Sequence, residues 1–167
     1  MNLPHSHNEY PMYLTTMKIG TFIEEFVPNR QVGIKLDDIV MNNLYDIRFL
    51  FFSQYEHDGR LGDKATREWI SQRVFPKTRQ NRDEILRDLG LSEYDQIEIF
   101  KKNFGACRKD PIWINFTGTM TFEDLYYNHD EIMADPFWRY YDGFVPKNVQ
   151  DVGIPLQAVF YNRIDRY

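Results

Sequence analysis

The sequence predicts an α+β fold with an N-terminal antiparallel sheet, a central three-helix segment, returning strands and an aromatic C-terminal region. Extended patterns rich in β-branched residues fill residues 12–36 between turn signals. Apolar residues then recur at helical spacing from residue 63 to residue 105. An alternating apolar run follows at residues 111–116. Because neither an internal repeat nor a low-complexity linker is present, we expect residues 1–167 to form one domain.

The N-terminal third is expected to supply the sheet. Residues 1–11 are polar and predict an arm without regular structure, whereas residues 12–36 predict two or three strands. Pro28-Asn29-Arg30 is the expected turn between them, since proline presets its φ angle. Residues 37–55 fit a buried strand or a short helix almost equally well, and residues 56–62 predict a loop.

Residues 63–116 form the expected helical module. The three helices are expected to begin at Asp63, Asn81 and Ser92 and to end at Phe75-Pro76, Gly90 and Gly105. Asn81 with Glu84 three residues later predicts a capping box. After the returning strand at 111–116, Thr121 with Asp124 predicts a short helix through Tyr127.

The remaining C-terminal signals are less regular. Residues 137–141 (FWRYY) form an aromatic cluster, and residues 156–164 predict a last strand or helix. Aromatic residues make up 16% of the chain, and we expect some of them at a binding surface because Tyr and Trp combine contact area with a polar group.

Charge and cysteine content exclude several classes of protein. A net charge of −5 argues against a surface built throughout to meet phosphate backbones. The single cysteine excludes an intramolecular disulfide framework, and no apolar run is long enough to span a bilayer. The N-terminus lacks the basic and apolar regions of a secretory signal, so we expect a cytoplasmic protein without membrane contact.

Motifs for catalysis or for metal binding are weak. Cys107 with His129 and Asp124 could form a thiol nucleophile, a base and an orienting carboxylate, but a lone cysteine after a helix is usually a packing residue. Four histidines could contribute metal ligands: His5, His7, His57 and His129. Because no HExxH, CxxC or EF-hand pattern accompanies them, we expect no metal site and no cofactor.

Paired carboxylates and phosphate loops give no stronger signal. Glu24-Glu25 and Asp37-Asp38 are interpreted as solvated edges, since neighbouring residues of a strand point to opposite faces. Neither GxGxxG nor GxxxxGK[ST] occurs, which disfavours a self-contained kinase, NTPase or Rossmann enzyme.

A basic cluster spans the first two helices and consists of Arg67, Arg73, Lys77, Arg79, Arg82 and Arg87. Within it, residues 77–82 suit phosphate or an acidic protein face. The alternatives are ion pairing with interleaved acids, contact with a protein, and contact with nucleic acid; the acidic net charge favours protein over nucleic acid. Reading of a DNA groove is disfavoured because Asp83 and Asp88 offset Arg82 and Arg87.

The run from Trp69 to Leu91, followed by Asp110-Pro-Ile-Trp-Ile, resembles a helical module that precedes the kinase domain in some HipA-like proteins of Firmicutes. The shared pattern is W-x-x-x-R-x-x-P, R-x-N, I-L-x-x-L-G and D-x-x-W-[IV], over about a third of the chain. The resemblance implies a small bacterial or mobile-element protein built on a recognition module. It implies no phosphotransfer, since the residues of a kinase are missing.

From these observations we hypothesise a small non-enzymatic binding protein of phage or mobile-element origin, which acts stoichiometrically on a host macromolecule and inhibits a host defence system. Its expected binding residues are Arg73, Lys77, Arg79, Arg82, Trp138, Tyr140 and Tyr141. The first alternative is a nucleic-acid-binding regulator that uses the four cations of this set. An enzyme without a recognisable motif is the second alternative.

Overall fold

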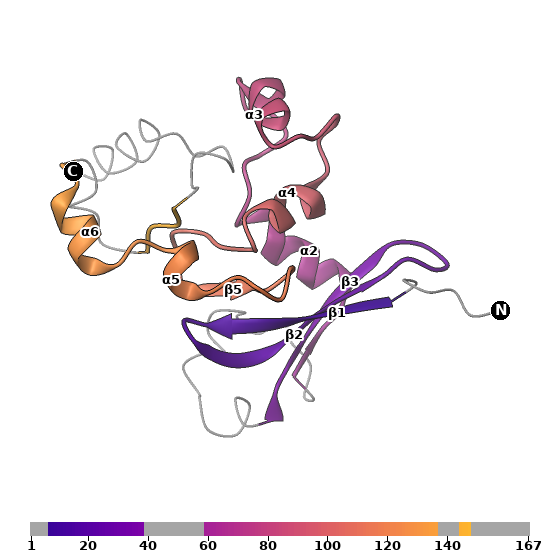
Figure 1. Cartoon of the computed structure of the whole chain (residues 1–167). Helices are drawn as coiled ribbons and strands as arrows, with labels where there is room; N and C mark the ends of the chain where they lie inside the picture. The colour runs from indigo at the N-terminus through magenta and orange to yellow at the C-terminus, as the bar shows by residue number, and fades with distance from the viewer. Residues whose placement is uncertain (1–6, 39–58, 137–143, 148–167) are drawn as a thin grey trace.

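A computed structural model describes residues 7–38, 59–136 and 144–147, and in these ranges one antiparallel sheet is covered by helices on one side (Figure 1). The strand order is β4-β3-β2-β1-β5. The strands are β1 (His7–Leu14), β2 (Met17–Glu25), β3 (Gln31–Leu36), β4 (Arg60–Leu61) and β5 (Ile112–Ile114). The helices are α2 (Asp63–Ser71), α3 (Arg82–Asp88), α4 (Gln96–Lys102), α5 (Phe122–Leu125) and α6 (His129–Ala134). The predicted α+β class is confirmed.

Strand β1 lies inside the sheet. It pairs with β2 from His7 opposite Glu25 to Leu14 opposite Met17, and its second half also pairs with β5. The prediction of an unstructured arm is therefore wrong for residues 7–11, while residues 1–6 lie outside the described ranges. The error arose because this strand exposes polar residues at its start, which hides the period-two pattern that continues through Met12.

A bulge interrupts the ladder between β1 and β2. Met12 lies opposite Gly20 and Tyr13 opposite Lys18, so Ile19 is an extra residue in the ladder. Ile19 and Gly20 are both buried. A Cβ atom on Gly20 would lie 2.5 Å from the carbonyl oxygen of Lys35, so only glycine allows β3 to approach this closely.

The edge of β3 is closed by two elements. Strand β4 covers Ile34 and Lys35, and the backbone N–H of Val32 donates to Asp63 Oδ1 at 2.9 Å. Asp63 is thus the first residue of α2 and contacts the sheet, while Gly62 is the N-cap. Helix α2 therefore begins at Asp63 as predicted, but the Asp63 side chain accepts from β3 instead of capping the helix. The prediction that residues 60–61 lie in a loop is wrong, because they pair with β3.

The central helices match the prediction in number but not in every end. Gly90 and Gly105 follow α3 and α4 with φ of 77° and 67°, which confirms two of the three expected stops. The third is wrong, because α2 ends at Ser71 rather than at Phe75-Pro76. The capping box at Asn81 is wrong, because that side chain makes no bond to the helix backbone. Helix α4 begins at Gln96 rather than near Ser92, since Asp95 accepts from the backbone N–H groups of Ile97 and Glu98.

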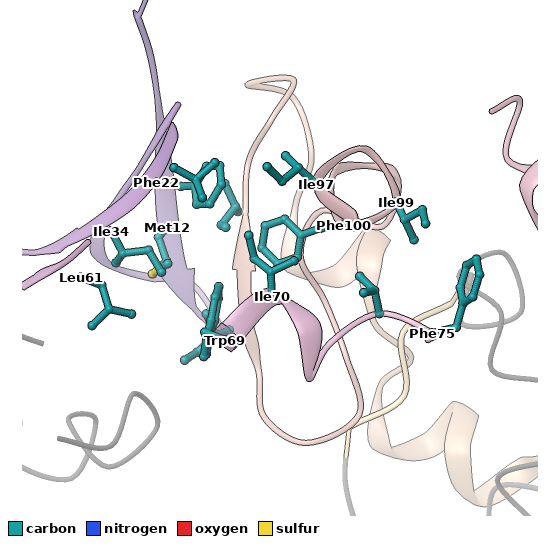
Figure 2. Packing of buried hydrophobic residues seen from close by; sticks show 14 of the residues in the cluster. Met12, Phe22, Ile34, Leu61, Trp69, Ile70, Phe75, Ile97, Ile99 and Phe100 are labelled. Atoms are coloured by element: carbon teal, nitrogen blue, oxygen red, sulfur yellow. The ribbon is translucent and has the colours of Figure 1, made fainter. Parts of the chain in front are cut away.

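The main core lies between the sheet and helices α2 and α4 (Figure 2). Its largest fully buried side chains are Phe22, Phe75, Phe100, Met12, Ile19, Ile34, Leu36, Ile70, Ile97, Ile99 and Ile112. A second cluster unites Ala106, Trp113, Leu125 and Tyr126. Strand β5 connects the two clusters, since Ile112 and Ile114 enter the first and Trp113 the second, so both faces of this strand are buried.

The C-terminal helices are short. The Thr121 hydroxyl accepts from Asp124 N and starts α5 as predicted, but the helix ends at Leu125 rather than Tyr127. Helix α6 was not expected, although Asn128 and Glu131 form a capping box at its start. The expected elements at residues 39–55, 137–141 and 156–164 lie outside the described residues.

Candidate binding surfaces

The segment Lys77–Arg82, here called the basic turn, connects α2 to α3 on a part of the molecule that projects from the sheet (Figure 1). Lys77 is exposed, and Arg79 and Arg82 are half-buried. Arg82 donates to the carbonyl oxygen of Lys77 and Arg79 Nε donates to Asn81 Oδ1, each at 2.9 Å. These bonds hold both guanidinium groups in place and leave further N–H donors for a ligand.

Within the basic turn, pairing with acids is limited. Arg82 lies 3.3 Å from Asp83, whose side chain is 83% exposed, and exposed pairs of this kind contribute little to stability. Partial burial lowers the pKa of Arg79 from its ordinary value, yet a guanidinium stays charged at neutral pH. The surface therefore keeps a positive charge that its own fold does not require.

Arg73 does not belong to this surface, and its prediction as a binding residue is wrong. Its side chain is buried and donates to both carboxylate oxygens of Asp110, at 2.8 and 3.0 Å. The carbonyl oxygens of Gly105 and Ile112 accept further bonds at 2.8 Å each. Burial opposes the charge, but attraction to Cys107 and Asp110 outweighs it and raises the pKa of Arg73. Arg73 therefore ties the segment that follows α2 to the segment before β5.

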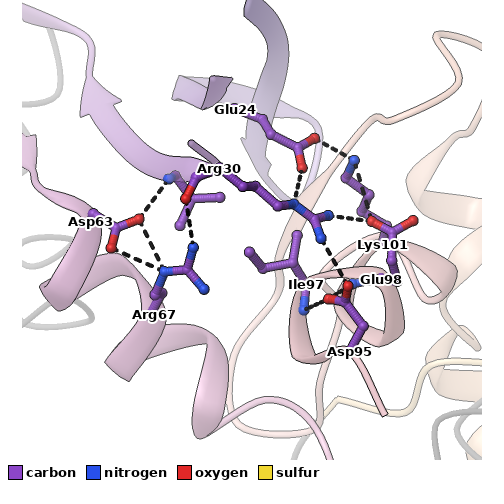
Figure 3. A network of polar contacts seen from close by, with 9 residues as sticks. Glu24, Arg30, Asp63, Arg67, Asp95, Ile97, Glu98 and Lys101 are labelled. Carbon is purple, nitrogen blue, oxygen red and sulfur yellow. Dashed lines mark hydrogen bonds and ion pairs between the residues drawn. The ribbon is translucent and has the colours of Figure 1, made fainter. Parts of the chain in front are cut away.

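A second polar cluster, the hairpin network, joins the β2–β3 hairpin to α4 (Figure 3). Its members are Glu24, Arg30, Asp95, Glu98 and Lys101. Arg30 donates to Glu24 at 2.8 Å and to Asp95 at 2.9 Å, and it also contacts Glu98. Burial disfavours the charged form of Arg30, but hydrogen bonds to Glu24 and Glu98 raise its pKa overall.

The interpretation of Glu24-Glu25 as a solvated pair is wrong for Glu24. Its side chain is 0% exposed and is held by Arg30 and Lys101, whereas Glu25 is exposed near His7. The two residues do point to opposite faces, as expected. The buried position of Glu24 on β2 can hold a charge because Arg30, across the hairpin, and Lys101, on α4, both reach it.

In the part of the chain that the structure describes, Cys107 makes no hydrogen bond to His129 or Asp124. Cys107 is buried, and its Sγ accepts from the backbone N–H of Lys109 at 3.4 Å. His129 and Asp124, by contrast, are exposed. The structure thus does not bring the three residues together.

The histidines are not gathered into a metal site in the part of the chain that the structure describes. Among these residues, no group of three His, Cys, Asp or Glu side chains is placed to hold an ion. The two ring nitrogens of His7 face different carboxylates, Glu9 at 3.4 Å and Glu25 at 3.6 Å. His5 and His57 lie outside the described residues.

A cavity of about 270 Å³ opens beside β3 and β4. Its charged lining residues are Glu25, Lys35, Arg60 and Asp63, and its apolar ones include Ile23 and Leu61. Because cations and carboxylates are balanced there, the lining favours no single class of small ligand.

The aromatic residues predicted to contribute to binding, Trp138, Tyr140 and Tyr141, lie outside the described residues. Within the described ranges, no helix has the length and apolar character needed to cross a membrane. Comparisons with protein-family models, with curated proteins and with solved structures find no match. The resemblance to the HipA-associated module therefore stays a prediction.

Proposed function

We propose that this chain is a small non-enzymatic protein that binds a host macromolecule stoichiometrically and contacts it through the basic turn. The observation that carries the proposal is the set of three cations on this turn, Lys77, Arg79 and Arg82. Two of them are held by bonds within the turn, so their side chains lose little freedom when a ligand binds. Carboxylates are the ligands that such a set of guanidinium groups favours on a protein.

An acidic protein face fits this surface better than nucleic acid does. Burial of Arg73 removes one of the four cations on which the nucleic-acid alternative depends. Three phosphate contacts would give a slope of log K against log salt concentration of only about −2.7. A protein that makes 6–10 phosphate contacts has a slope of about −5.4 to −9. Asp83 beside Arg82 weakens the local field further.

The finer proposal concerns the target and the origin of the protein. We propose a cytoplasmic protein of phage or mobile-element origin that inhibits a host defence nuclease. Support comes from the acidic net charge of −5, the abundance of aromatic residues and the module-like pattern from Trp69 to Ile114. A stoichiometric inhibitor would lower nuclease activity in proportion to its concentration until inhibitor and target are equimolar.

The experiment that tests the binding surface is a pull-down from host cytoplasm with the intact protein and two triple variants. One variant changes Lys77, Arg79 and Arg82 to Gln, and the matched control changes three exposed lysines elsewhere, Lys64, Lys102 and Lys109, to Gln. Both variants lose three positive charges. We expect one host protein to be retained by the native chain and by the control, and lost by the basic-turn variant.

Three outcomes would contradict the proposal. Equal retention by all three proteins would place the contact elsewhere, and turnover of a substrate by the isolated protein would remove the non-enzymatic assignment. Retention of nucleic acid, with an affinity that falls steeply with salt and depends on the basic turn, would favour the regulator instead.

A further inference from the structure

The turn between β2 and β3 presents an apolar tip. Phe26 is 37% exposed and Val27 is 53% exposed, and Pro28 follows them on the surface. We call residues 26–28 the hairpin tip. Figure 1 shows the hairpin reaching past the sheet beside the start of β1, and well apart from α3. Adjacent exposed apolar side chains at the end of a projecting element are typical of a contact surface.

The surroundings of the hairpin tip are acidic. Glu9 and Glu25 lie on one side, next to His7, and the hairpin network lies on the other. The carboxylates linked in these contacts are Glu9, Glu24, Glu25, Asp95 and Glu98. Against these five, Arg30 and Lys101 supply two positive charges, which leaves an excess of three negative charges with His7 neutral.

The base of the hairpin is firmly held. Arg30, directly after the turn, is bonded to Glu24 and Asp95, and its carbonyl oxygen accepts from Arg67 at 2.9 Å (Figure 3). A partner that binds the hairpin tip would therefore meet a surface already in place, and little conformational freedom would be lost on binding.

We propose that the hairpin tip is an interaction surface for a cationic partner protein, one whose apolar face is bordered by lysine or arginine. Charge complementarity selects this partner, because an acidic rim repels nucleic acid and anionic lipid. The surface goes beyond the proposed function and does not depend on it, since none of the basic-turn residues takes part.

The probe is a fluorescently labelled amphipathic helical peptide of leucine and lysine, titrated with the intact chain and followed by anisotropy. A peptide with glutamate in place of lysine is the charge control. We expect the lysine peptide to bind at the hairpin tip, and any binding of the glutamate peptide to depend on the basic turn and not on the hairpin tip. The double variant Phe26→Ser and Val27→Ser should weaken binding of the lysine peptide by at least about tenfold, the factor that corresponds to 1.4 kcal/mol.

Matched variants distinguish binding at the hairpin tip from non-specific binding of the peptide elsewhere on the surface. Met17→Ser with Met133→Ser changes two other exposed apolar residues and should leave the affinity unchanged. Glu9→Gln with Glu25→Gln should weaken binding, whereas Asp83→Asn with Glu84→Gln, on α3, should not. The triple Gln variant of the basic turn should bind the lysine peptide as the native chain does, which keeps this test distinct from the preceding one.

Absence of binding to the lysine peptide would overturn the proposal. Equal weakening by the hairpin variants and their matched controls would also overturn it, since the attraction would then be general. Thermal unfolding of each variant provides the folding control, and the charge variant Glu9→Gln with Glu25→Gln keeps the test valid should the apolar variant misfold.

Discussion

The pair formed by Arg73 and Asp110 shows how one residue can change role with burial. Both side chains lie away from water, and Arg73 also donates to two carbonyl oxygens and lies with its guanidinium 4.5 Å from the centre of the Trp69 ring. Removing both partners from water is costly, so such a pair holds only when its hydrogen bonds are satisfied. The role of Arg73 is therefore to fix the position of β5 against the segment that follows α2.

Loss of the Asp110 charge should destabilise the protein strongly. We expect Asp110→Asn to lower the free energy of unfolding by about 3–5 kcal/mol, because Arg73 would remain buried without its counter-charge. Asp83→Asn is the matched control, since Asp83 also pairs with an arginine but is exposed, and it should cost less than about 0.5 kcal/mol. Urea unfolding measures both, and similar values for the two variants would contradict this account.

At the scale of elements, the β2–β3 hairpin and α4 are joined by charge as well as by apolar packing. Phe22 and Phe100 have ring centroids 5.6 Å apart, and beside them Glu24 is held by Arg30 and Lys101. Lys101 also lies over the rings of Tyr10 and Phe116, at 5.8 and 5.9 Å. One helix end thus contacts residues of three separate parts of the chain.

The adjacent residues Glu24 and Glu25 allow a direct test of this junction. We expect Glu24→Ala to cost about 1.5–3 kcal/mol of unfolding free energy, since Arg30 and Lys101 lose their buried partner but keep Glu98. Glu25→Ala has the same change in size and charge on the same strand, and should cost less than about 1 kcal/mol. Chemical denaturation distinguishes them, and a larger effect for Glu25 would refute the assignment of Glu24 as the buried partner.

At the scale of the whole molecule, β1 connects parts that are far apart in sequence. Tyr13 pairs with Lys18 on one side and with Trp113 on the other, and its ring stacks on Trp113 with centroids 4.8 Å apart. The indole N–H of Trp113 donates to the carbonyl oxygen of Thr15 at 2.7 Å. The main core and the second cluster thus meet at this strand.

Removal of residues 1–11 should therefore prevent cooperative folding. The deletion removes five of the eight β1–β2 pairs and the Pro11 carbonyl that accepts from Asn115 N. Thermal unfolding followed by circular dichroism should show no sharp transition for the shortened chain, in contrast to the full chain. A cooperative transition with a midpoint near that of the full chain would mean that residues 1–11 are dispensable for folding.

The sequence was sufficient for features that depend on neighbouring residues. The stops at Gly90 and Gly105, the start of α5 at Thr121 and the strands between residues 17 and 36 follow from turn chemistry and side-chain periodicity. The fold class follows as well, because these local signals occur in the order strands, helices, strand.

The tertiary structure decided which charges are buried and which are free for a partner. Glu24 and Lys101 are 77 positions apart, and Arg73 and Asp110 are 37 apart, so no local pattern reveals either pair. A charge becomes stable away from water only when a distant opposite charge reaches it, and that depends on how the elements pack. For the same reason the candidate surfaces, the basic turn and the hairpin tip, became distinct only once the buried charges were known.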